Sequence, residues 1–192
     1  MDRLPRNRYF IFGFLSSGSL WLDLWSKDRV FAELGLFNRT GWLLDGWVKF
    51  ELHTNLNMGA LWGMGQGFAG VFAALSVVAF VGIIYYLFIR KAAVSLWLTV
   101  ALSFVTGGTL GNLYDRLGMH DVCLPGQDVP ARAVRDFFHF QLGSFDWAIF
   151  NVADICLVTG AIMLMIQSML QPNTASEAVS ENAQPPLADR IA

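Results

Sequence analysis

The chain has 192 residues, of which 55% are hydrophobic and 14% aromatic, and its formal net charge at pH 7 is −2. Charged residues make up 15% of the chain, well below the roughly 25% of an ordinary soluble domain. This composition predicts an integral membrane protein of one domain and, because the basic residues form no block, argues against a nucleic-acid-binding surface.

Four apolar segments predict four transmembrane helices, so the expected fold class is an all-α integral membrane protein. The first segment, residues 9–25, follows three arginines and lacks a small-residue cleavage motif, so we interpret it as a retained helix. It is at the short end of the roughly 17–25 residues that span a bilayer. The other three, residues 67–89, 92–114 and 147–170, are long enough to span it comfortably.

The connecting segments predict a small cap at one membrane surface. In residues 26–66, the stretch WVKFELHT alternates apolar and polar residues, which predicts a strand, and RVFAELGLF predicts a short interfacial helix. In the second connecting segment, residues 115–146, the stretch HDVCLPGQDVPAR contains Pro and Gly and predicts a loop. We therefore expect one membrane domain, residues 1–170, with a β-containing cap between its first two helices. Residues 171–192 are polar and predict a disordered tail.

Basic residues near the helix ends predict the orientation of the chain. Three arginines lie within the first eight residues, and Arg90 and Lys91 fill the tight turn between the second and third helices. With four spans these two sites share one side, which the positive-inside rule assigns to the cytoplasm. Both termini are then cytoplasmic, and the cap is extracytoplasmic.

The unusual polar residues converge in the outer half of this predicted bundle, and four chain segments contribute them. Asp154 is the least expected, because it would lie about seven residues into the fourth helix, roughly 10 Å from its start. The set comprises Asp23, Asn57, Asn112, Asp115, Asp136 and Asp154.

A carboxylate within an apolar helix is costly and needs a partner or a proton. A second carboxyl supplies both, because two acids that share a proton leave one charged and one neutral at the same pH. Such a pair can activate a water and protonate a carbonyl or a leaving group. On the residues alone, Asp136, Asp115 and Asp23 are each candidate partners of Asp154.

Several of these features also have simpler interpretations. Asp23 and Lys27 are spaced as a pair that could finish a helix, and Gly107 to Gly111 form a GxxxG motif that predicts close helix packing. The three histidines and two cysteines fit no metal-ligand spacing. We therefore expect surface or loop histidines and no metal ligands.

Five short blocks resemble, in order, those of the lipoprotein signal peptidase family, also called signal peptidase II. The resemblance covers about residues 21–170, and the segment between Asp115 and Asp136 is longer than is usual in the family. The blocks are LDLWSK with Asp23 and Lys27, NMGALW with Asn57 and Gly59, GGTLGNLYDR with Gly108, Asn112, Asp115 and Arg116, VRDFF with Asp136, and FNVAD with Asn151 and Asp154.

The resemblance implies a membrane aspartic endopeptidase of the bacterial inner membrane. It selects Asp136 and Asp154 as the catalytic pair, near the extracytoplasmic face. Such an enzyme removes the signal peptide of prolipoproteins immediately before a diacylglyceryl-modified cysteine and needs no cofactor, so its partners are prolipoproteins and membrane lipid. The residues implied to bind substrate or support the site are Asp23, Lys27, Asn57, Gly59, Gly108, Asn112, Asp115, Arg116 and Asn151.

Two other functions fit part of the pattern. A proton-linked transporter could use Asp154 as a relay, but it predicts polar residues at every membrane depth, and the cytoplasmic halves of the predicted helices are apolar. A membrane scaffold built on GxxxG contacts predicts that Asp136→Asn and Asp154→Asn would be tolerated.

Overall fold

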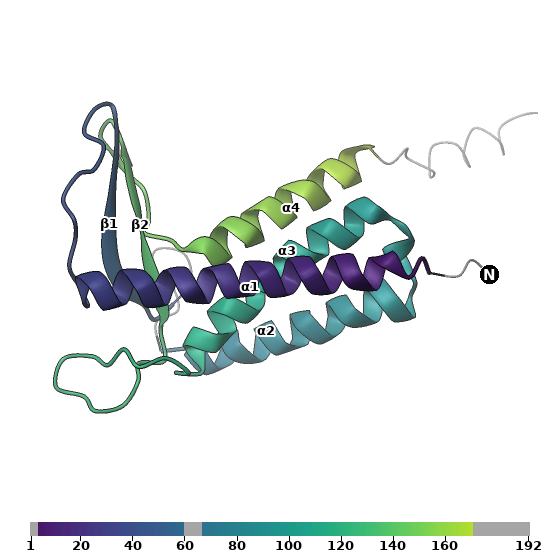
Figure 1. Cartoon of the computed structure of the whole chain (residues 1–192), viewed down its shortest axis with the longest axis horizontal. Helices are drawn as coiled ribbons and strands as arrows, with labels where there is room; N and C mark the ends of the chain where they lie inside the picture. The colour runs from purple at the N-terminus through teal and green to yellow at the C-terminus, as the bar shows by residue number, and fades with distance from the viewer. Residues whose placement is uncertain (1–3, 60–66, 171–192) are drawn as a thin grey trace, which may run out of the picture.

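The computed structural model describes residues 4–59 and 67–170, so the predicted disordered tail lies outside the described residues. Four long helices run side by side, and a small sheet stands across one end of the bundle (Figure 1). The helix α3 packs against each of the other three. The helices are α1 (Asn7–Leu34), α2 (Ala69–Ile84), α3 (Leu96–Arg116) and α4 (Val152–Leu170), with a π-helical turn, η2 (Tyr85–Ile89), and a 3₁₀ turn, η3 (Ala92–Val94), between α2 and α3.

Three helical stretches within the described residues are long and apolar enough to cross a bilayer. They are Ala69–Ile89, Leu96–Arg116 and Val152–Leu170, which agree with the second, third and fourth predicted spans. The first predicted span, residues 9–25, lies within α1. The composition of α1 does not single it out as a span, so the fourth membrane crossing stays a prediction.

The helix α1 is longer than the sequence indicated. The prediction of a separate interfacial helix at RVFAELGLF is wrong, because α1 continues without a break to Leu34. The preceding polar residues do not end the helix, since Asp23 and Lys27 are fully buried and pair with each other. The helix ends only at Gly35, whose φ of 73° lies in the left-handed region that favours glycine.

The cap is an antiparallel sheet with the order β1–β2–β3, and both connecting segments contribute strands to it. The strand predicted at WVKFELHT is confirmed by β1 (Val48–Asn57). The loop predicted at HDVCLPGQDVPAR, residues 120–132, is confirmed. The same connecting segment also contains two strands that were not predicted, β2 (Val134–Leu142) and β3 (Phe145–Asp146). The first four residues of β2 are all buried, so burial on both faces removes the alternation by which a strand is recognised.

The pairing of β1 with β2 contains a β-bulge. Glu51 pairs with His139 and Asn55 with Asp136, and the register shifts between Leu52 and Asn55. Two residues of β1, His53 and Thr54, therefore lie opposite one residue of β2. Side chains alternate between the faces of a strand, so Asp136 and His139 point to opposite faces of the sheet.

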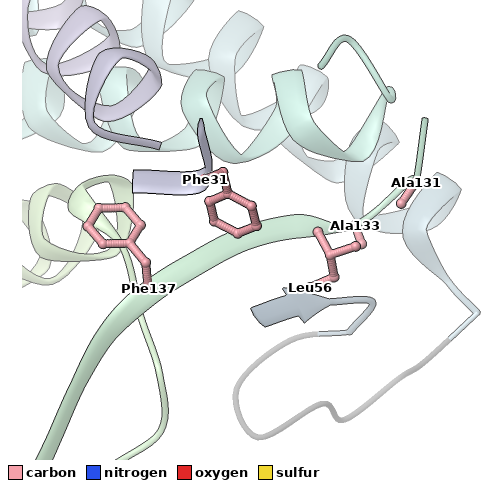
Figure 2. Packing of buried hydrophobic residues seen from close by; sticks show 5 residues of the cluster. All are labelled: Phe31, Leu56, Ala131, Ala133 and Phe137. Atoms are coloured by element: carbon pink, nitrogen blue, oxygen red, sulfur yellow. The ribbon is translucent and has the colours of Figure 1, made fainter. Parts of the chain in front are cut away.

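A small hydrophobic cluster joins the cap to the helix bundle. Figure 2 shows Phe31 of α1 and Leu56 of β1 beside three residues from β2 and the segment before it. Phe137 is 1% exposed and adjoins Asp136 in the chain, so its packing on one face of β2 fixes the direction of Asp136 on the other. The cluster consists of Phe31, Leu56, Ala131, Ala133 and Phe137.

Two glycines bring α3 close to its neighbours. A Cβ added at Gly107 would lie 2.8 Å from the backbone oxygen of Ser16 in α1, and one at Gly108 would clash with the backbone oxygen of Ala153 in α4. The prediction that the GxxxG segment packs helices is therefore confirmed.

Candidate active site

Asp154 lies in the first turn of α4. The prediction that it sits about two turns into a helix beginning at residue 147 is wrong, because α4 begins at Val152. The residues before it pair with the sheet: the backbone N–H of Phe150 donates to the oxygen of Phe138 at 3.0 Å. Asp154 is half-buried at a helix N-terminus, where a carboxylate is favoured by the unpaired N–H groups and the helix dipole.

Asp136 is buried in β2 and accepts two side-chain hydrogen bonds. Asn57 donates through Nδ2 to Oδ2 at 3.1 Å, and Asn151 donates through Nδ2 to Oδ1 at 2.6 Å. Only 1% of the surface of Asp136 is exposed. Burial, and then the negative charge of Asp154, raise the pKa of Asp136 to about 8, against the lowering effect of Lys27 and the two amides. Asp136 therefore favours the protonated form at neutral pH.

Two asparagines connect the carboxyl groups of Asp136 and Asp154. Asn151 donates from its backbone N–H to Asp154 Oδ2 at 3.1 Å while its side chain bonds Asp136. Asn112 donates through Nδ2 to Asp154 Oδ1 at 2.9 Å and accepts from Asn151 Nδ2 at 3.2 Å. The four side chains form one hydrogen-bonded group contributed by β2, α3 and the start of α4.

Asp23 and Asp115, the other two candidate partners of Asp154, are engaged by Lys27. Lys27 Nζ lies 2.7 Å from Asp23 Oδ2 and 3.0 Å from Asp115 Oδ2, and all three side chains are fully buried. The same Nζ donates to Asn112 Oδ1 at 3.2 Å. The interpretation of Asp23 and Lys27 as a pair that only finishes a helix is therefore wrong, because the pair lies in the middle of α1 and connects it to α3.

The two engaged aspartates also fix the elements that carry the site. Asp23 Oδ1 accepts a hydrogen bond at 2.8 Å from the backbone N–H of Ala153 and so caps α4 from a neighbouring helix. Asp115 accepts hydrogen bonds from the backbone N–H of Arg135 at 2.9 Å and from its Nε at 3.1 Å. Arg135 immediately precedes Asp136, so this contact sets the position of the buried carboxyl.

Arg135 and its second partner, Asp28, were missed by the sequence reasoning. Arg135 is 2% exposed, and its Nη1 donates to Asp28 Oδ1 at 2.6 Å. The sequence did offer one signal, the arginine next to the aspartate in VRDFF. A buried arginine requires carboxylate partners, but the burial of Arg135 became evident only when the structure showed a buried strand there.

The remaining predicted residues lie at the edge of the site. Gly59 donates from its N–H to Asn57 Oδ1 at 3.0 Å, and Arg116 Nη2 approaches the oxygen of Gly59 at 3.4 Å. The guanidinium group of Arg116 lies 5.4 Å from the ring centre of Phe72. Gly108 allows α3 to approach α4, because an added Cβ would meet the backbone oxygen of Ala153.

Both carboxyl groups line a pocket of about 750 Å³ beside the sheet. Most of its wall is aliphatic or aromatic. Neither Asp23 nor Asp115 lines it. The lining residues are Asn57, Asn112, Arg116, Val134, Asp136, Phe140, Leu142, Trp147, Ala148, Ile149, Phe150, Asp154, Ile155, Leu157, Val158 and Thr159.

Comparison with known proteins assigns the family. The model of signal peptidase (SPase) II matches residues 15–170 of this chain. The chain belongs to the lipoprotein signal peptidase family. It is 46% identical over 168 residues to a lipoprotein signal peptidase of Rhodopirellula baltica, and the aligned region covers 85% of this chain and 74% of that protein. It is 34% identical over 138 residues to one of Bacillus pumilus, which covers 72% of this chain and 79% of that protein.

A solved structure shares the fold of this chain. A bacterial membrane enzyme determined by the in meso method superposes with a TM-score of 0.67 at 22% identity, covering 91% of this chain and 92% of that one. Family membership makes this protein a bacterial membrane enzyme of the aspartic protease type. The activity that the family supports is the cleavage of prolipoprotein signal peptides.

Proposed function

We propose that this enzyme cuts prolipoproteins immediately before a diacylglyceryl-modified cysteine and that Asp136 and Asp154 are its catalytic pair. The observation that carries the proposal is the contact of one residue, Asn151, with both carboxyl groups at the wall of an apolar pocket. A shared hydrogen-bonding residue holds two acids at a fixed separation, which aspartic protease chemistry requires.

The different environments of the two acids suit different roles. Asp154 is half-buried and carries the negative charge that raises the pKa of Asp136, so it acts as the general base toward water. Asp136 is protonated and acts as the general acid toward the carbonyl oxygen of the scissile peptide. The attack of water, with its proton passing to Asp154, yields a tetrahedral intermediate with two hydroxyl groups. On its collapse the C–N bond breaks, Asp154 gives its proton to the amine leaving group, and Asp136 takes back a proton from one hydroxyl, which returns the pair to its starting state.

The neighbouring residues act by positioning. Asn57, Asn112 and Asn151 orient the carboxyl groups through the hydrogen bonds described above. Arg116 and Gly59 lie at the edge where an extended peptide would enter, and Lys27 stabilises the aspartates that fix α4 and β2. A network whose donors and acceptors are paired in advance reduces reorganisation during the reaction.

The proposed substrate follows from the pocket and its place in the fold. The wall is mostly aliphatic and aromatic, which suits acyl chains, and the carboxyl groups lie at the sheet end of the bundle where a lipid-anchored cysteine would be held. We place the enzyme in the inner membrane with four spans, α1 included. In Figure 1, the end of the bundle opposite the sheet carries the N-terminal end of α1, the turn between α2 and α3, and the end of α4. These parts would be cytoplasmic.

The hydrogen bonds deeper in α3 favour a peptidase over a proton-linked transporter. Ser103 and Thr106 are buried there, but their hydroxyls donate to the backbone oxygens of Thr99 and Leu102 in the same helix at 2.6 and 2.7 Å. A proton relay needs donors and acceptors that connect one level of the membrane with the next. These hydroxyls complete their bonds within one helix turn.

A cleavage assay tests the proposed substrate and cleavage position. Purified protein in detergent is incubated with a diacylglyceryl-modified prolipoprotein and with the same precursor lacking the lipid, and the products are identified by mass spectrometry. We expect cleavage of the lipidated precursor only, with the modified cysteine as the new N-terminus. Cleavage at another bond, or equal cleavage of the unmodified precursor, would contradict the proposal, and proton uptake by reconstituted vesicles without cleavage would favour a transporter.

A further inference from the structure

Two histidines and a glutamate meet in the cap, away from the candidate active site. Glu51 and His53 come from β1, and His139 comes from β2. One ligand atom from each residue, a carboxylate oxygen or an imidazole nitrogen, lies within 4.8 Å of the other two. The sequence could not indicate this group, because 86 residues separate the two histidines and only the pairing of Glu51 with His139 brings them together.

The distances suit a transition-metal ion of the zinc class. Glu51 Oε1 lies 2.9 Å from His139 Nδ1 and 4.0 Å from His53 Nδ1. Tetrahedral zinc with bonds of about 2.1 Å holds its ligand atoms roughly 3.4 Å apart, so small side-chain rotations reach the required geometry. Two histidines and one carboxylate form a common zinc ligand set, which leaves a fourth position for water.

Two further observations point to a ligand at this position. His53 Nδ1 is buried and has no hydrogen-bond partner among the described residues, so this nitrogen is available to a ligand at a position 4.0 Å from Glu51 Oε1. Asp146 Oδ1 lies 2.7 Å from His139 Nε2. A carboxylate at one imidazole nitrogen accepts its N–H and directs the lone pair of the other nitrogen toward a metal, as in many zinc sites.

The surrounding charges allow a cation to bind. Glu51 is 1% exposed, and with Asp146 it provides two negative charges. Arg39 is the opposing group, with Nη1 at 4.0 Å from Glu51 Oε1. The Arg39 side chain is 66% exposed, so it can move into solvent when a cation takes its place.

We propose that the cap binds a divalent transition-metal ion, of the class of Zn²⁺, through Glu51, His53 and His139. The ion lies on the face of the sheet opposite Asp136, since side chains alternate along β2. It joins the bulged part of β1 to β2 and stabilises the cap. This site is independent of the proposed peptidase reaction, and the reaction takes no step through it.

Metal binding to the full-length, tag-free protein in detergent tests the site. Zn²⁺ binding is measured by calorimetry after chelator treatment, and Co²⁺ is titrated separately because its visible absorption reports tetrahedral coordination. We expect one Zn²⁺ per chain, a tetrahedral Co²⁺ spectrum and a higher unfolding temperature with Zn²⁺. His53→Gln and Glu51→Gln should abolish saturable binding, and Asp146→Asn should weaken it by roughly 10- to 100-fold.

Two more variants sharpen the test. Arg39→Gln should tighten Zn²⁺ binding, because it removes the positive charge beside Glu51. His120→Gln is the matched control: His120 Nδ1 accepts from the Val122 N–H at 3.1 Å, outside the cluster, so its loss should leave binding unchanged. Absence of saturable binding to wild type, or binding that survives in His53→Gln, would overturn the proposal. His53 is partly exposed, so this variant decides the outcome even if His139→Gln fails to fold.

Discussion

Asn151 and Asp154 cap each other across the first turn of α4. Asn151 Oδ1 accepts from the backbone N–H of Asp154 at 3.0 Å, and Asp154 Oδ2 accepts from the backbone N–H of Asn151 at 3.1 Å. This is the reciprocal geometry of a capping box, with an aspartate in the position usually taken by glutamate. The element that begins the helix thus also holds one proposed catalytic carboxyl and, through the Asn151 amide, contacts the other.

Asn151→Ala should therefore reduce cleavage more than its effect on stability explains. Loss of the cap should cost about 1 kcal/mol of unfolding free energy, and cleavage should also fall because Asp136 and Asp154 lose a shared donor. Ser95→Ala is the matched control, since Ser95 caps α3 by accepting from the Leu98 N–H at 3.2 Å. Thermal unfolding and cleavage rates are measured together. Equal losses of activity in the two variants would show that Asn151 acts only as a helix cap.

Lys27→Met should strongly destabilise the fold. It would leave the fully buried Asp23 and Asp115 without their shared cation, and removal of one partner from a buried ion pair costs roughly 3–5 kcal/mol. Arg29→Met is the control, because Arg29 pairs with Glu33 at 3.5 Å on the exposed face of the same helix, where such pairs contribute little. Denaturant unfolding in detergent measures both. A Lys27→Met protein as stable as Arg29→Met would refute the structural role of this network.

Gly108→Ala should separate α3 from α4. The added methyl group would meet the backbone oxygen of Ala153, which a rotamer change cannot relieve, and overpacking of this kind costs roughly 1–3 kcal/mol. Gly82→Ala makes the same change in α2, where nothing lies within 4 Å of the added Cβ, so it should be neutral or slightly stabilising. The melting temperatures of the two variants measure this difference. If both variants melt together, the contact at Gly108 is looser than described.

The pH dependence of cleavage should report the proton on Asp136. The pKa of this group is raised to about 8, chiefly by burial and then by the charge of Asp154, so activity should fall as the pH rises through about 8. Asn57→Ala should move this fall to higher pH, because it removes a hydrogen bond that lowers the pKa. If Asn57→Ala leaves the pH of this decrease in activity unchanged, or moves it to lower pH, a group other than Asp136 controls the pH dependence.

The stability of the protein should change in the same pH range. The pKa of Asp136 in the folded chain, about 8, lies above its ordinary value of about 3.8. Between these two pH values the folded chain keeps a proton on Asp136 that the unfolded chain has released. The contribution of Asp136 to stability is therefore fully present below about pH 4 and is lost as the pH rises toward 8. Unfolding of wild type and Asp136→Asn across this range isolates the effect, since the variant should lack it.

The sequence predicted the membrane helices well and the cap less completely. The second, third and fourth predicted spans were found because an apolar run of sufficient length is a local property. The strand β2 was missed because it is buried on both faces and because Arg135, Asp136 and His139 interrupt its apolar residues. Its strand character depends on the pairing with β1, which lies about 80 residues earlier in the chain.

The site shows the same division between local and distant contacts. Motif order identified Asp136, Asp154 and the asparagines around them, but the start of α4 was misplaced by five residues because Phe150 pairs with β2. Arg135 and Asp28 were missed, since nothing local connects residues 107 positions apart. The GxxxG motif from Gly107 to Gly111 was correctly expected to pack helices, because the spacing of small residues on a helix is itself a local signal.

The most direct test of the account compares cleavage by Asp136→Asn, Asp154→Asn, the double variant and the exposed control Asp128→Asn. Each protein is first checked for wild-type folding in detergent, and initial rates are measured on a diacylglyceryl-modified prolipoprotein. We expect each single variant to lose roughly 10²–10⁴-fold in rate, the double variant to be little worse than either because the pair acts as a unit, and Asp128→Asn to match wild type. Substantial cleavage by a well-folded Asp136→Asn or Asp154→Asn would contradict the aspartate pair.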